Sequence, residues 1–498
     1  MRHYDTLFVY KGQIMSRISL KNKYKSLPVQ VKASLWFLIC SFLQKGISMI
    51  TTPIFTRLLN TAEYGQFNVF NSWYGIVAII VGLSLTSGVH TQGLIKYDEE
   101  RKIFSSSLLG LTTVLTVLWI AIYLIAKDFW NEVLNLTTIQ VLAMLVMVWT
   151  TAVFNFWANE QRVTYSYKVL VIVTLFVSFA KPLVGIFLVT HYEDKVTARI
   201  LGIVFVELVF YSWMYIYQMH KGKKFFSAKF WKYALIFNLP LVPHYLSQTV
   251  LISADRIMIQ NMVGDSEAGI YSLAYSISLI MTLFNTALGQ TLNPWIYQKI
   301  KDKKSKDIAP IAYSTLILIA VVNILFIFLA PEVVAIFAPS SYHEAVFAIP
   351  PIAMSVYFLY CYDLFAKFAF YYEKTTQIMI ATMAGAILNI GLNYIGIKLY
   401  GYIAAAYTTL ICYMAYSFFH YFLMIRVCKK YNDNYVPYST KHIVLISMVF
   451  IVMGFIGLAT YHSDIFRYII IAVMVAAMIV FRKRIRKLAD MIFAIKKA

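Results

Sequence analysis

The chain has 498 residues, of which 60% are hydrophobic and only 13% are charged, and its formal net charge is +21. Such a chain has too little polar surface to coat soluble domains, so its composition excludes a soluble protein and indicates a polytopic membrane protein. In that setting the basic residues report membrane topology, and no nucleic-acid partner is expected.

Fourteen apolar segments along the chain are candidates to cross a bilayer as a helix, which takes about 20 residues. They lie near 34–56, 66–86, 104–126, 136–158, 169–190, 200–219, 233–254, 269–292, 308–330, 345–366, 375–397, 401–425, 443–461 and 465–481. The last is the weakest, because Arg467 shortens its uninterrupted apolar run. The sequence therefore predicts an all-α polytopic membrane protein with about 14 transmembrane helices.

A short pattern, Glu-x-Gly-x-aromatic, occurs at 63–67 and again at 267–271, an offset of 204 residues. Each copy adjoins a long apolar segment, so the chain is predicted to contain two copies of one membrane unit. Duplicated halves with a substrate site between them near the bilayer midplane are typical of secondary transporters. Transport is therefore the leading hypothesis.

The basic residues alternate between the two sides of the predicted spans. If the N-terminus is cytoplasmic, the inside segments hold most of the 44 Lys and Arg residues. The outside segments then hold only Arg57, Lys127, Lys195, Arg199, Lys398 and Arg467. This asymmetry follows the positive-inside rule, so both termini are predicted to be cytoplasmic.

The connections between spans are short, which disfavours an integral membrane transferase or polymerase of polysaccharide assembly, because such an enzyme is expected to carry its acids and bases on a larger loop or domain. The sequence contains no phosphate-binding loop and no GxGxxG, HExxH or GxSxG motif, so we expect no enzymatic activity. The four cysteines have no ligand-like spacing. We therefore expect no cofactor, metal or disulfide, and the chemistry left to the chain is binding and conformational change.

Four stretches carry a family resemblance. They are Arg57-Leu58-Leu59-Asn60-Thr61-Ala62-Glu63-Tyr64-Gly65, Leu239-Pro240-Leu241-Val242-Pro243-His244, Asp255-Arg256 and Gly269-Ile270-Tyr271-Ser272-Leu273. In these stretches and in its fourteen-span layout, the chain resembles the bacterial polysaccharide-export proteins. These are oligosaccharide flippases of the multidrug/oligosaccharidyl-lipid/polysaccharide superfamily.

The resemblance implies two pseudo-symmetric six-helix lobes around a central cavity, at roughly 1–220 and 221–428. Two accessory helices would follow in 429–498. Within that range, apolar residues at helical spacing against a basic face predict an amphipathic tail from residue 482 onward. The implied activity is alternating-access movement of undecaprenyl-pyrophosphate-linked repeat units across the bacterial cytoplasmic membrane, for a capsule or O-antigen type of polysaccharide. The partners would be the lipid-linked oligosaccharide, membrane lipids, a polysaccharide polymerase and a chain-length regulator. The alternative within transport is a multidrug or small-cation exporter of the related branch.

Basic residues within spans are the first candidates for a substrate site, because an ionisable side chain in a span normally faces a cavity or a partner. Lys45 and Lys181 lie mid-span, and Arg57 and Arg256 lie nearer the outer end. A fixed cation in a water-filled cavity would lower the barrier to moving a lipid diphosphate. The alternative for each is a structural role, as a helix cap or in an ion pair such as Lys181 with Glu207.

Acidic residues are the candidates for gating or ion coupling. Asp255 beside Arg256 could form a charged pair that breaks and reforms at the outer mouth. Glu207 and Asp363 could bind a coupling proton or sodium ion, since a carboxyl group in a low dielectric is costly to ionise. The alternative for Asp363 is an ion pair with Lys45.

Neutral polar residues and prolines complete the predicted site. Several amide side chains lie in or beside the predicted spans, and the main candidates for substrate binding are Gln44, Asn155 and Gln248. The others are Asn159, Asn285, Gln290 and Asn293. Such amides suit the hydroxyl groups of an oligosaccharide and equally suit hydrogen bonding between helices. Pro240 and Pro243 open the second copy and are the predicted hinge, because a proline within a span frees a backbone carbonyl group and permits bending.

Overall fold

The computed structural model describes residues 24, 26–483 and 486, and its elements are helices joined by short connections. The basic amphipathic tail predicted from residue 482 onward lies almost entirely outside the described residues. The helices of the first half are α2 (Val29–Leu58), α3 (Thr61–Gly82), α4 (Gly88–Lys96), α5 (Arg101–Ile125), α6 (Lys127–Leu134), α7 (Thr138–Val163), α8 (Tyr167–His191) and α9 (Lys195–Gly222).

The rest of the chain is helical in the same way. Its helices are α10 (Ala228–Asn238), α11 (Val242–Met262), α12 (Asp265–Ser278), α13 (Thr282–Lys301), α14 (Ile308–Phe328), α15 (Ala330–Phe337), α16 (Ala345–Tyr371), α17 (Thr375–Tyr400), α18 (Ala404–Tyr431), α19 (Thr440–Ala459) and α20 (Asp464–Val480). Short 3-10 turns, η1 (Leu239–Leu241) and η2 (Leu279–Met281), join α10 to α11 and α12 to α13.

The all-α membrane fold predicted from the sequence is confirmed. Twelve helical segments of the described chain are long and apolar enough to cross a membrane, against fourteen expected. The other two expected segments also form helices, as α3 and α20. Helix α3 is rich in polar residues, and α20 has only 17 residues, so neither is counted among the twelve.

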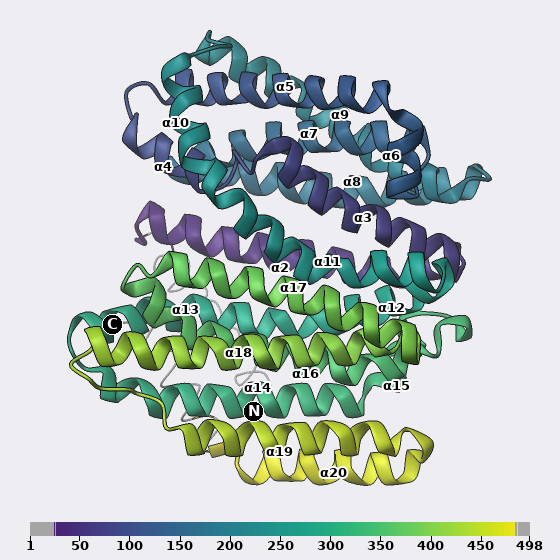
Figure 1. Ribbon diagram of the computed structural model, residues 1–498, viewed down its shortest axis with the longest axis vertical. Coiled ribbons are helices and arrows are strands. Elements are labelled where there is room, and N and C mark those ends of the chain that lie inside the picture. Colours follow the sequence, from purple (N-terminus) through teal and green to yellow (C-terminus); the bar gives the residue numbers. More distant parts are fainter. Residues whose placement is uncertain (1–23, 25, 484–485, 487–498) are drawn as a thin grey trace, which may run out of the picture.

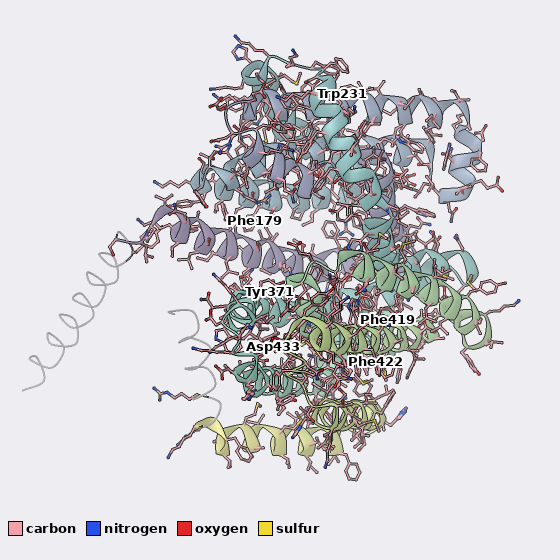
Figure 2. The ribbon with its side chains drawn as sticks, turned by 60° about the vertical axis from the view of Figure 1, so that its left-hand side comes forward. Phe179, Trp231, Tyr371, Phe419, Phe422 and Asp433 are labelled. Atoms are coloured by element: carbon pink, nitrogen blue, oxygen red, sulfur yellow. The ribbon has the colours of Figure 1, made fainter. Side chains whose placement is uncertain are left out.

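In Figure 1, α3 to α9 of the first half form the upper part together with α10, the first helix of the second half, and α11 to α18 form the lower part. Helix α2 runs between them, and α19 and α20 cover the lower edge. Exposed aromatic side chains such as Phe179 on α8 and Phe422 on α18 (Figure 2) form the kind of surface that faces lipid. The lobe boundaries at 220 and 428 stay predictions.

Glu63 of the repeated pattern has a local structural role. Asn60 accepts a hydrogen bond from the backbone N–H of Glu63, and the Glu63 carboxylate accepts one from the backbone N–H of Asn60, each at 2.8 Å. This reciprocal capping box satisfies two backbone donors that the first turn of α3 would otherwise leave unpaired. The acidic residue of the pattern therefore helps to set the start of α3.

The two glycines of the repeated pattern lie against each other where α3 and α12 begin. A Cβ atom on Gly65 would stand 1.9 Å from the carbonyl oxygen of Asp265, and one on Gly269 would stand 1.9 Å from that of Thr61. Thr61 and Asp265 are themselves separated by the repeat offset, so the contact is reciprocal. Only glycine allows this backbone approach. The duplication thus becomes a symmetric contact between the halves.

The second half begins with a broken helix. Helix α10 ends at Asn238, η1 follows, and α11 starts at Val242, so Pro240 lies inside the interruption and Pro243 at its end. Helix α10 packs against α4 and α5, where the Trp231 indole N–H donates to the carbonyl oxygen of Ser107 at 2.8 Å (Figure 2). Helix α11 packs against α3 and α17. The break falls at the predicted hinge, and the flexing itself stays a prediction.

Candidate functional site

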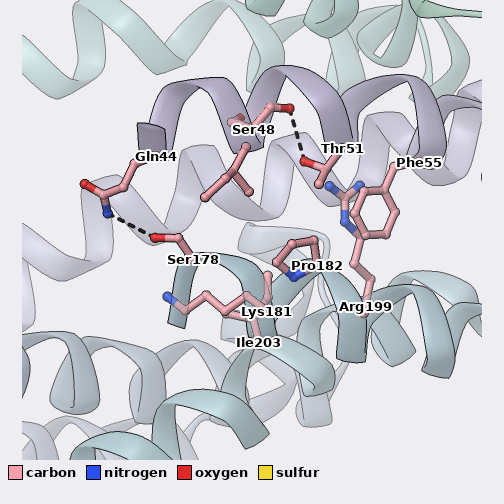
Figure 3. A pocket seen from close by; sticks show the side chains of 11 residues that line it. Gln44, Ser48, Thr51, Phe55, Ser178, Lys181, Pro182, Arg199 and Ile203 are labelled. Atoms are coloured by element: carbon pink, nitrogen blue, oxygen red, sulfur yellow. Dashed lines mark hydrogen bonds between the residues drawn. The ribbon is translucent and has the colours of Figure 1, made fainter. Parts of the chain in front are cut away.

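A cavity of about 270 Å³ opens between α2, α8 and α9, and we call it the first cavity (Figure 3). Its lining is Gln44, Ile47, Ser48, Thr51, Phe55, Ser178, Lys181, Pro182, Gly185, Arg199 and Ile203. The Gln44 amide N–H donates to the Ser178 hydroxyl at 3.2 Å and bridges α2 and α8. The first cavity therefore brings together Gln44 of α2 and Lys181 of α8, two residues predicted from the sequence.

Lys181 reaches this cavity while it is ion-paired with Glu207. Its Nζ atom lies 2.6 Å from Oε1 of Glu207, and the lysine side chain is 30% exposed while the glutamate is 2% exposed. Oε2 of Glu207 also accepts a hydrogen bond from the Thr150 hydroxyl at 2.5 Å. The predicted alternative partner of Lys181 is thus present. The glutamate is fully engaged, whereas the lysine still presents part of its side chain to the cavity.

Arg199 supplies a second positive charge to the first cavity. Its guanidinium carbon lies 3.6 Å from the ring centroid of Phe55 and 3.5 Å from that of Phe67, so the group is held between two aromatic faces. Figure 3 shows the guanidinium group stacked on Phe55. Nη1 of Arg199 is buried without a hydrogen-bond partner, and no described acidic side chain is close enough to pair with it. Arg199 is therefore held in place by ring stacking and keeps its charge uncompensated.

Sequence reasoning assigned Arg199 to an outside segment and did not select it as a site residue. The residue is the fifth of α9, at a helix end where a linear count of charges treats it as part of a loop. The signal that could have found it is Phe67, an aromatic residue of the repeated pattern, but pairing it with Arg199 requires the fold.

The other predicted cations lie in different surroundings. Arg57 donates to the carbonyl oxygen of Pro53 at 2.8 Å and to that of Ile336 at 3.2 Å, so it ties the end of α2 to α15. Lys45 is exposed on α2, and no ion pair involving it is present among the described residues. The ion pair of Lys45 with Asp363, the structural alternative considered from the sequence, is therefore not formed.

Asp363 pairs instead with Lys367. Oδ1 of Asp363 lies 2.5 Å from Nζ of Lys367, one turn further along α16. The lysine side chain is only 8% exposed, and the aspartate is 35% exposed. Residues four positions apart on a helix lie on the same face, so Lys367 is close to Asp363 whatever the packing of neighbouring helices. Lys367 was counted as a topology signal in the sequence, where nothing marks it as buried.

The predicted gate pair, Asp255 with Arg256, is not formed. Neighbouring residues on an α-helix point in directions about 100° apart. Both side chains contact α12, but Arg256 also reaches α3, whereas Asp255 also reaches α17 and α18. The Arg256 guanidinium lies 4.2 Å from the ring centroid of Tyr275 and 3.5 Å from the Ser72 hydroxyl on α3. Asp255 turns into the second half, away from this contact.

Asp255 is fully buried in a cluster of neutral donors. Its Oδ2 atom accepts from the Tyr271 hydroxyl and from the Thr409 hydroxyl, each at 2.7 Å, and its Oδ1 atom accepts from the Asn393 amide at 2.5 Å. Asn389 lies one turn from Asn393 and is bonded to it. Within the described chain no cationic side chain pairs with this carboxyl group. The cluster is a buried carboxyl group satisfied only by hydrogen bonds.

A second cavity of about 330 Å³ lies between α13 and α16, and we call it the second cavity. Its lining is Thr282, Asn285, Thr286, Gly289, Gln290, Asn293, Leu359, Tyr360, Tyr362 and Asp363. Three of the amides predicted to suit sugar hydroxyl groups, Asn285, Gln290 and Asn293, therefore lie together on one wall of the second cavity. Asn155 on α7 and Gln248 on α11 line neither cavity.

Comparison with models of known protein families shows the family to which this chain belongs. The model of a family described as polysaccharide biosynthesis protein matches residues 31–299, which is more than half of the chain. The chain belongs to this family. A second model, MatE, matches residues 240–395. The resemblance predicted from the sequence is therefore confirmed.

The chain is also similar to two curated proteins. The Lsg locus putative protein 1 of Haemophilus influenzae is 22% identical over 385 residues, covering 72% of this chain and 89% of that protein. An uncharacterized membrane protein of the same organism is 20% identical over 373 residues, covering 72% of this chain and 89% of that protein.

Solved structures show that the fold is one used by flippases and transporters. An inward closed conformation of the lipid II flippase MurJ matches with a TM-score of 0.70 at 14% identity, covering 91% of this chain and 99% of that one. An inward-facing multidrug resistance MATE family transporter of the MOP superfamily matches with a TM-score of 0.60 at 15% identity, covering 78% of this chain and 96% of that one.

Proposed function

We propose that this protein is a flippase that moves undecaprenyl-pyrophosphate-linked oligosaccharide across the bacterial cytoplasmic membrane by alternating access, for a capsule or O-antigen type of polysaccharide. One observation carries the proposal. The first cavity lies within the membrane-spanning helices and contains Lys181 and the unpaired Arg199. Membership of the polysaccharide biosynthesis family and the flippase fold support the same conclusion.

The physical reason concerns the diphosphate. A phosphate anion that leaves one headgroup layer loses its hydration, and fixed cations in a water-filled cavity replace part of that stabilisation. Arg199 and Lys181 together carry two positive charges, and Glu207 balances one of them. The excess positive charge favours an anion at this cavity, with Lys45, Arg57 and Arg256 as further candidate contacts along its path.

The proposed test is direct. Deletion of the gene should abolish surface polymer, and a plasmid copy should restore it. Arg199→Leu should fail to restore it although the protein inserts at a normal level. The purified protein should move a fluorescent undecaprenyl diphosphate disaccharide across proteoliposomes. Normal polymer in the Arg199→Leu strain would contradict the proposal.

We propose that ion coupling uses the buried cluster around Asp255. A buried carboxylate without a cationic partner is costly, and binding a proton or a sodium ion would relieve that cost. Hydroxyl and carboxylate oxygens are ligands that hard cations prefer, and Thr409 and Asp255 bring them together, whereas Asn393 presents its amide nitrogen to Asp255. Asp255→Asn should remove the dependence of transport on a sodium or proton gradient; persistence of that dependence would contradict the proposal. Glu207 and Asp363 already have cationic partners.

The second candidate function is export of drugs or small cations. It is favoured by the MatE match over residues 240–395 and by the MATE structures. The excess positive charge of the first cavity argues against a cationic cargo there. Unchanged drug susceptibility together with lost polymer in a deletion strain would favour the flippase, and the reverse result would favour the exporter. The transferase or polymerase alternative stays disfavoured by the short connections.

The topology proposed for this membrane protein has both termini in the cytoplasm. Reporter fusions after residues 228 and 303 should then read cytoplasmic, and fusions near 265 and 335 should read external.

A polysaccharide polymerase and a chain-length regulator are the proposed protein partners. Co-purification of either with the tagged protein from membranes is the corresponding test.

A further inference from the structure

The second cavity differs from the first in the chemistry of its lining. It presents three carboxamides, two threonine hydroxyl groups and two tyrosines, all of them uncharged. On α13 the residues recur at helical spacing, as Thr282, Asn285, Thr286, Gly289 and Asn293, so they share one face. This face offers paired donors and acceptors in the way that sugar hydroxyl and N-acetyl groups require.

This face of α13 cannot be explained as a lipid-facing surface. Thr286 and Gln290 are exposed, yet they lie inside the segment Asp265–Lys301, which is long and apolar enough to cross the membrane. The Thr286 hydroxyl donates to the carbonyl oxygen of Thr282 at 2.8 Å, but the Gln290 carboxamide facing hydrocarbon would be left without hydrogen-bond partners at a cost of several kcal/mol. The side chains must therefore face water or a polar ligand.

The charge of the second cavity is balanced. Asp363 is its one charged lining residue, and Lys367 neutralises it at 2.5 Å. A cavity without excess positive charge has no electrostatic preference for phosphate, and one without excess negative charge has none for a cation. Its chemistry selects an uncharged, hydroxyl-rich group.

The cavity also holds unused bonding capacity and free space. The Asn285 amide donates to the carbonyl oxygen of Val356 at 3.0 Å, but its own Oδ1 atom is buried without a partner. Gly289 forms part of the wall, where a Cβ atom would make only ordinary contacts of 3.6 Å with Asn293 and 3.7 Å with Asp363. A ligand hydroxyl or amide N–H can satisfy Asn285, and the missing side chain at Gly289 leaves room for a ring.

We infer that the second cavity binds one uncharged sugar residue of the lipid-linked oligosaccharide while the first cavity attracts its diphosphate. The inference rests on the proposed flippase function and adds a subsite for the glycan. A cavity of about 330 Å³ is at the lower end of the range for small-molecule sites and suits a single sugar ring. Asn285, Gln290 and Asn293 supply the hydrogen bonds, and Tyr362 adds an aromatic side chain to the lining.

The test compares binding of lipids with and without a sugar to the full-length protein in nanodiscs. The probes are undecaprenyl diphosphate alone and the same lipid carrying one hexose, one N-acetylhexosamine or one hexuronate. The wild type should bind at least one of the two uncharged glycolipids about tenfold more tightly than the bare lipid, equivalent to about 1.4 kcal/mol. The hexuronate should gain less than the uncharged sugar that binds best.

Gly289→Leu fills the cavity and should remove this tenfold preference without changing the affinity for undecaprenyl diphosphate. Asn293→Leu keeps a similar size, removes hydrogen bonding and should have the same effect to a smaller degree. The matched control is Gly391→Leu on α17, where a Cβ atom meets nothing within 4 Å and the preference should persist.

The outcomes separate the two proposals. If the wild type binds none of the four lipids, the flippase proposal itself fails. If it binds them without any preference for an uncharged sugar, or if Gly289→Leu and Asn293→Leu both retain the preference, the sugar subsite is overturned while the flippase proposal stands.

Discussion

The two halves of this protein are alike where they meet and different where each has a cavity. At the contact, Gly65 and Gly269 occupy equivalent places and approach each other's backbones in the same way. In the cavities, the first half keeps an uncompensated cation, Arg199, whereas the second half neutralises its one charged lining residue, Asp363, with Lys367. Duplication has preserved the contact between the helices and allowed the cavity linings to diverge.

The largest effect should come from removing Lys181. Lys181→Met leaves Glu207 buried without its cation, which should lower the free energy of unfolding by about 3–5 kcal/mol. The double variant Lys181→Met with Glu207→Gln should recover most of that stability, measured by thermal unfolding of the purified protein. Surface polymer should stay absent in the double variant if Lys181 contacts substrate. Restored polymer would assign Lys181 a purely structural role and weaken the contrast between the cavities.

The contact between the halves should respond equally from either side. Gly65→Ala and Gly269→Ala each place a Cβ atom against a backbone carbonyl, and such overpacking costs about 1–3 kcal/mol or more. Both should lower the melting temperature by similar amounts and reduce surface polymer. Gly46→Ala on α2, where a Cβ atom meets nothing within 4 Å, is the matched control. A normal melting temperature in only one of the two variants would break the symmetry.

The second cavity should tolerate loss of its charges when both are removed together. Asp363→Asn alone leaves Lys367 buried without an acid and should reduce protein level and polymer. Adding Lys367→Met should bring polymer back near the wild-type amount, because the pair serves to keep the cavity neutral. Quantitative blotting of protein and polymer in the same cells checks both values. Lost polymer at normal protein level in the double variant would mean that Asp363 acts through its charge.

The smallest effect should follow from a change of shape at constant charge. Arg199→Lys keeps the positive charge but loses the planar group held between Phe55 and Phe67. Stacking of this kind contributes about 0.5–2 kcal/mol, so affinity for undecaprenyl diphosphate should fall several-fold, measured in nanodiscs. Arg199→Leu should lose much more. Equal losses in the two variants would show that the planar shape of the guanidinium group, and not its charge, matters at this residue.

Periodicity and repeats predicted the elements of this fold well. Each of the fourteen apolar segments overlaps one or more helices in the structure, and the repeated pattern marks the contact between the halves. Both signals are local, so a linear sequence displays them. Pro240 and Pro243 likewise predicted the position of the broken helix, because proline lacks the backbone N–H donor wherever it occurs.

The partners within the site were harder to predict, because they depend on helix rotation and on distant residues. The donors to Asp255 come from residues 16, 138 and 154 positions away along the chain, and the sequence pattern offered only its neighbour Arg256. Lys181 with Glu207 was foreseen as an alternative, since both are rare charges in neighbouring spans. Arg199 was missed, because only the folded chain brings Phe55 and Phe67 to its two faces.

The reciprocal glycine contact has the form of an isologous interface, the kind found in a two-fold symmetric homodimer, where residue i touches j and j touches i. Its tightest approaches involve backbone atoms of one half against backbone atoms of the other. The exposed connection around 223–226, between α9 and α10, plays no part in that contact. The halves should therefore recognise each other as two separate polypeptides. A chain divided at this connection and co-expressed in one membrane is expected to reassemble as a heterodimer of pseudo-identical subunits.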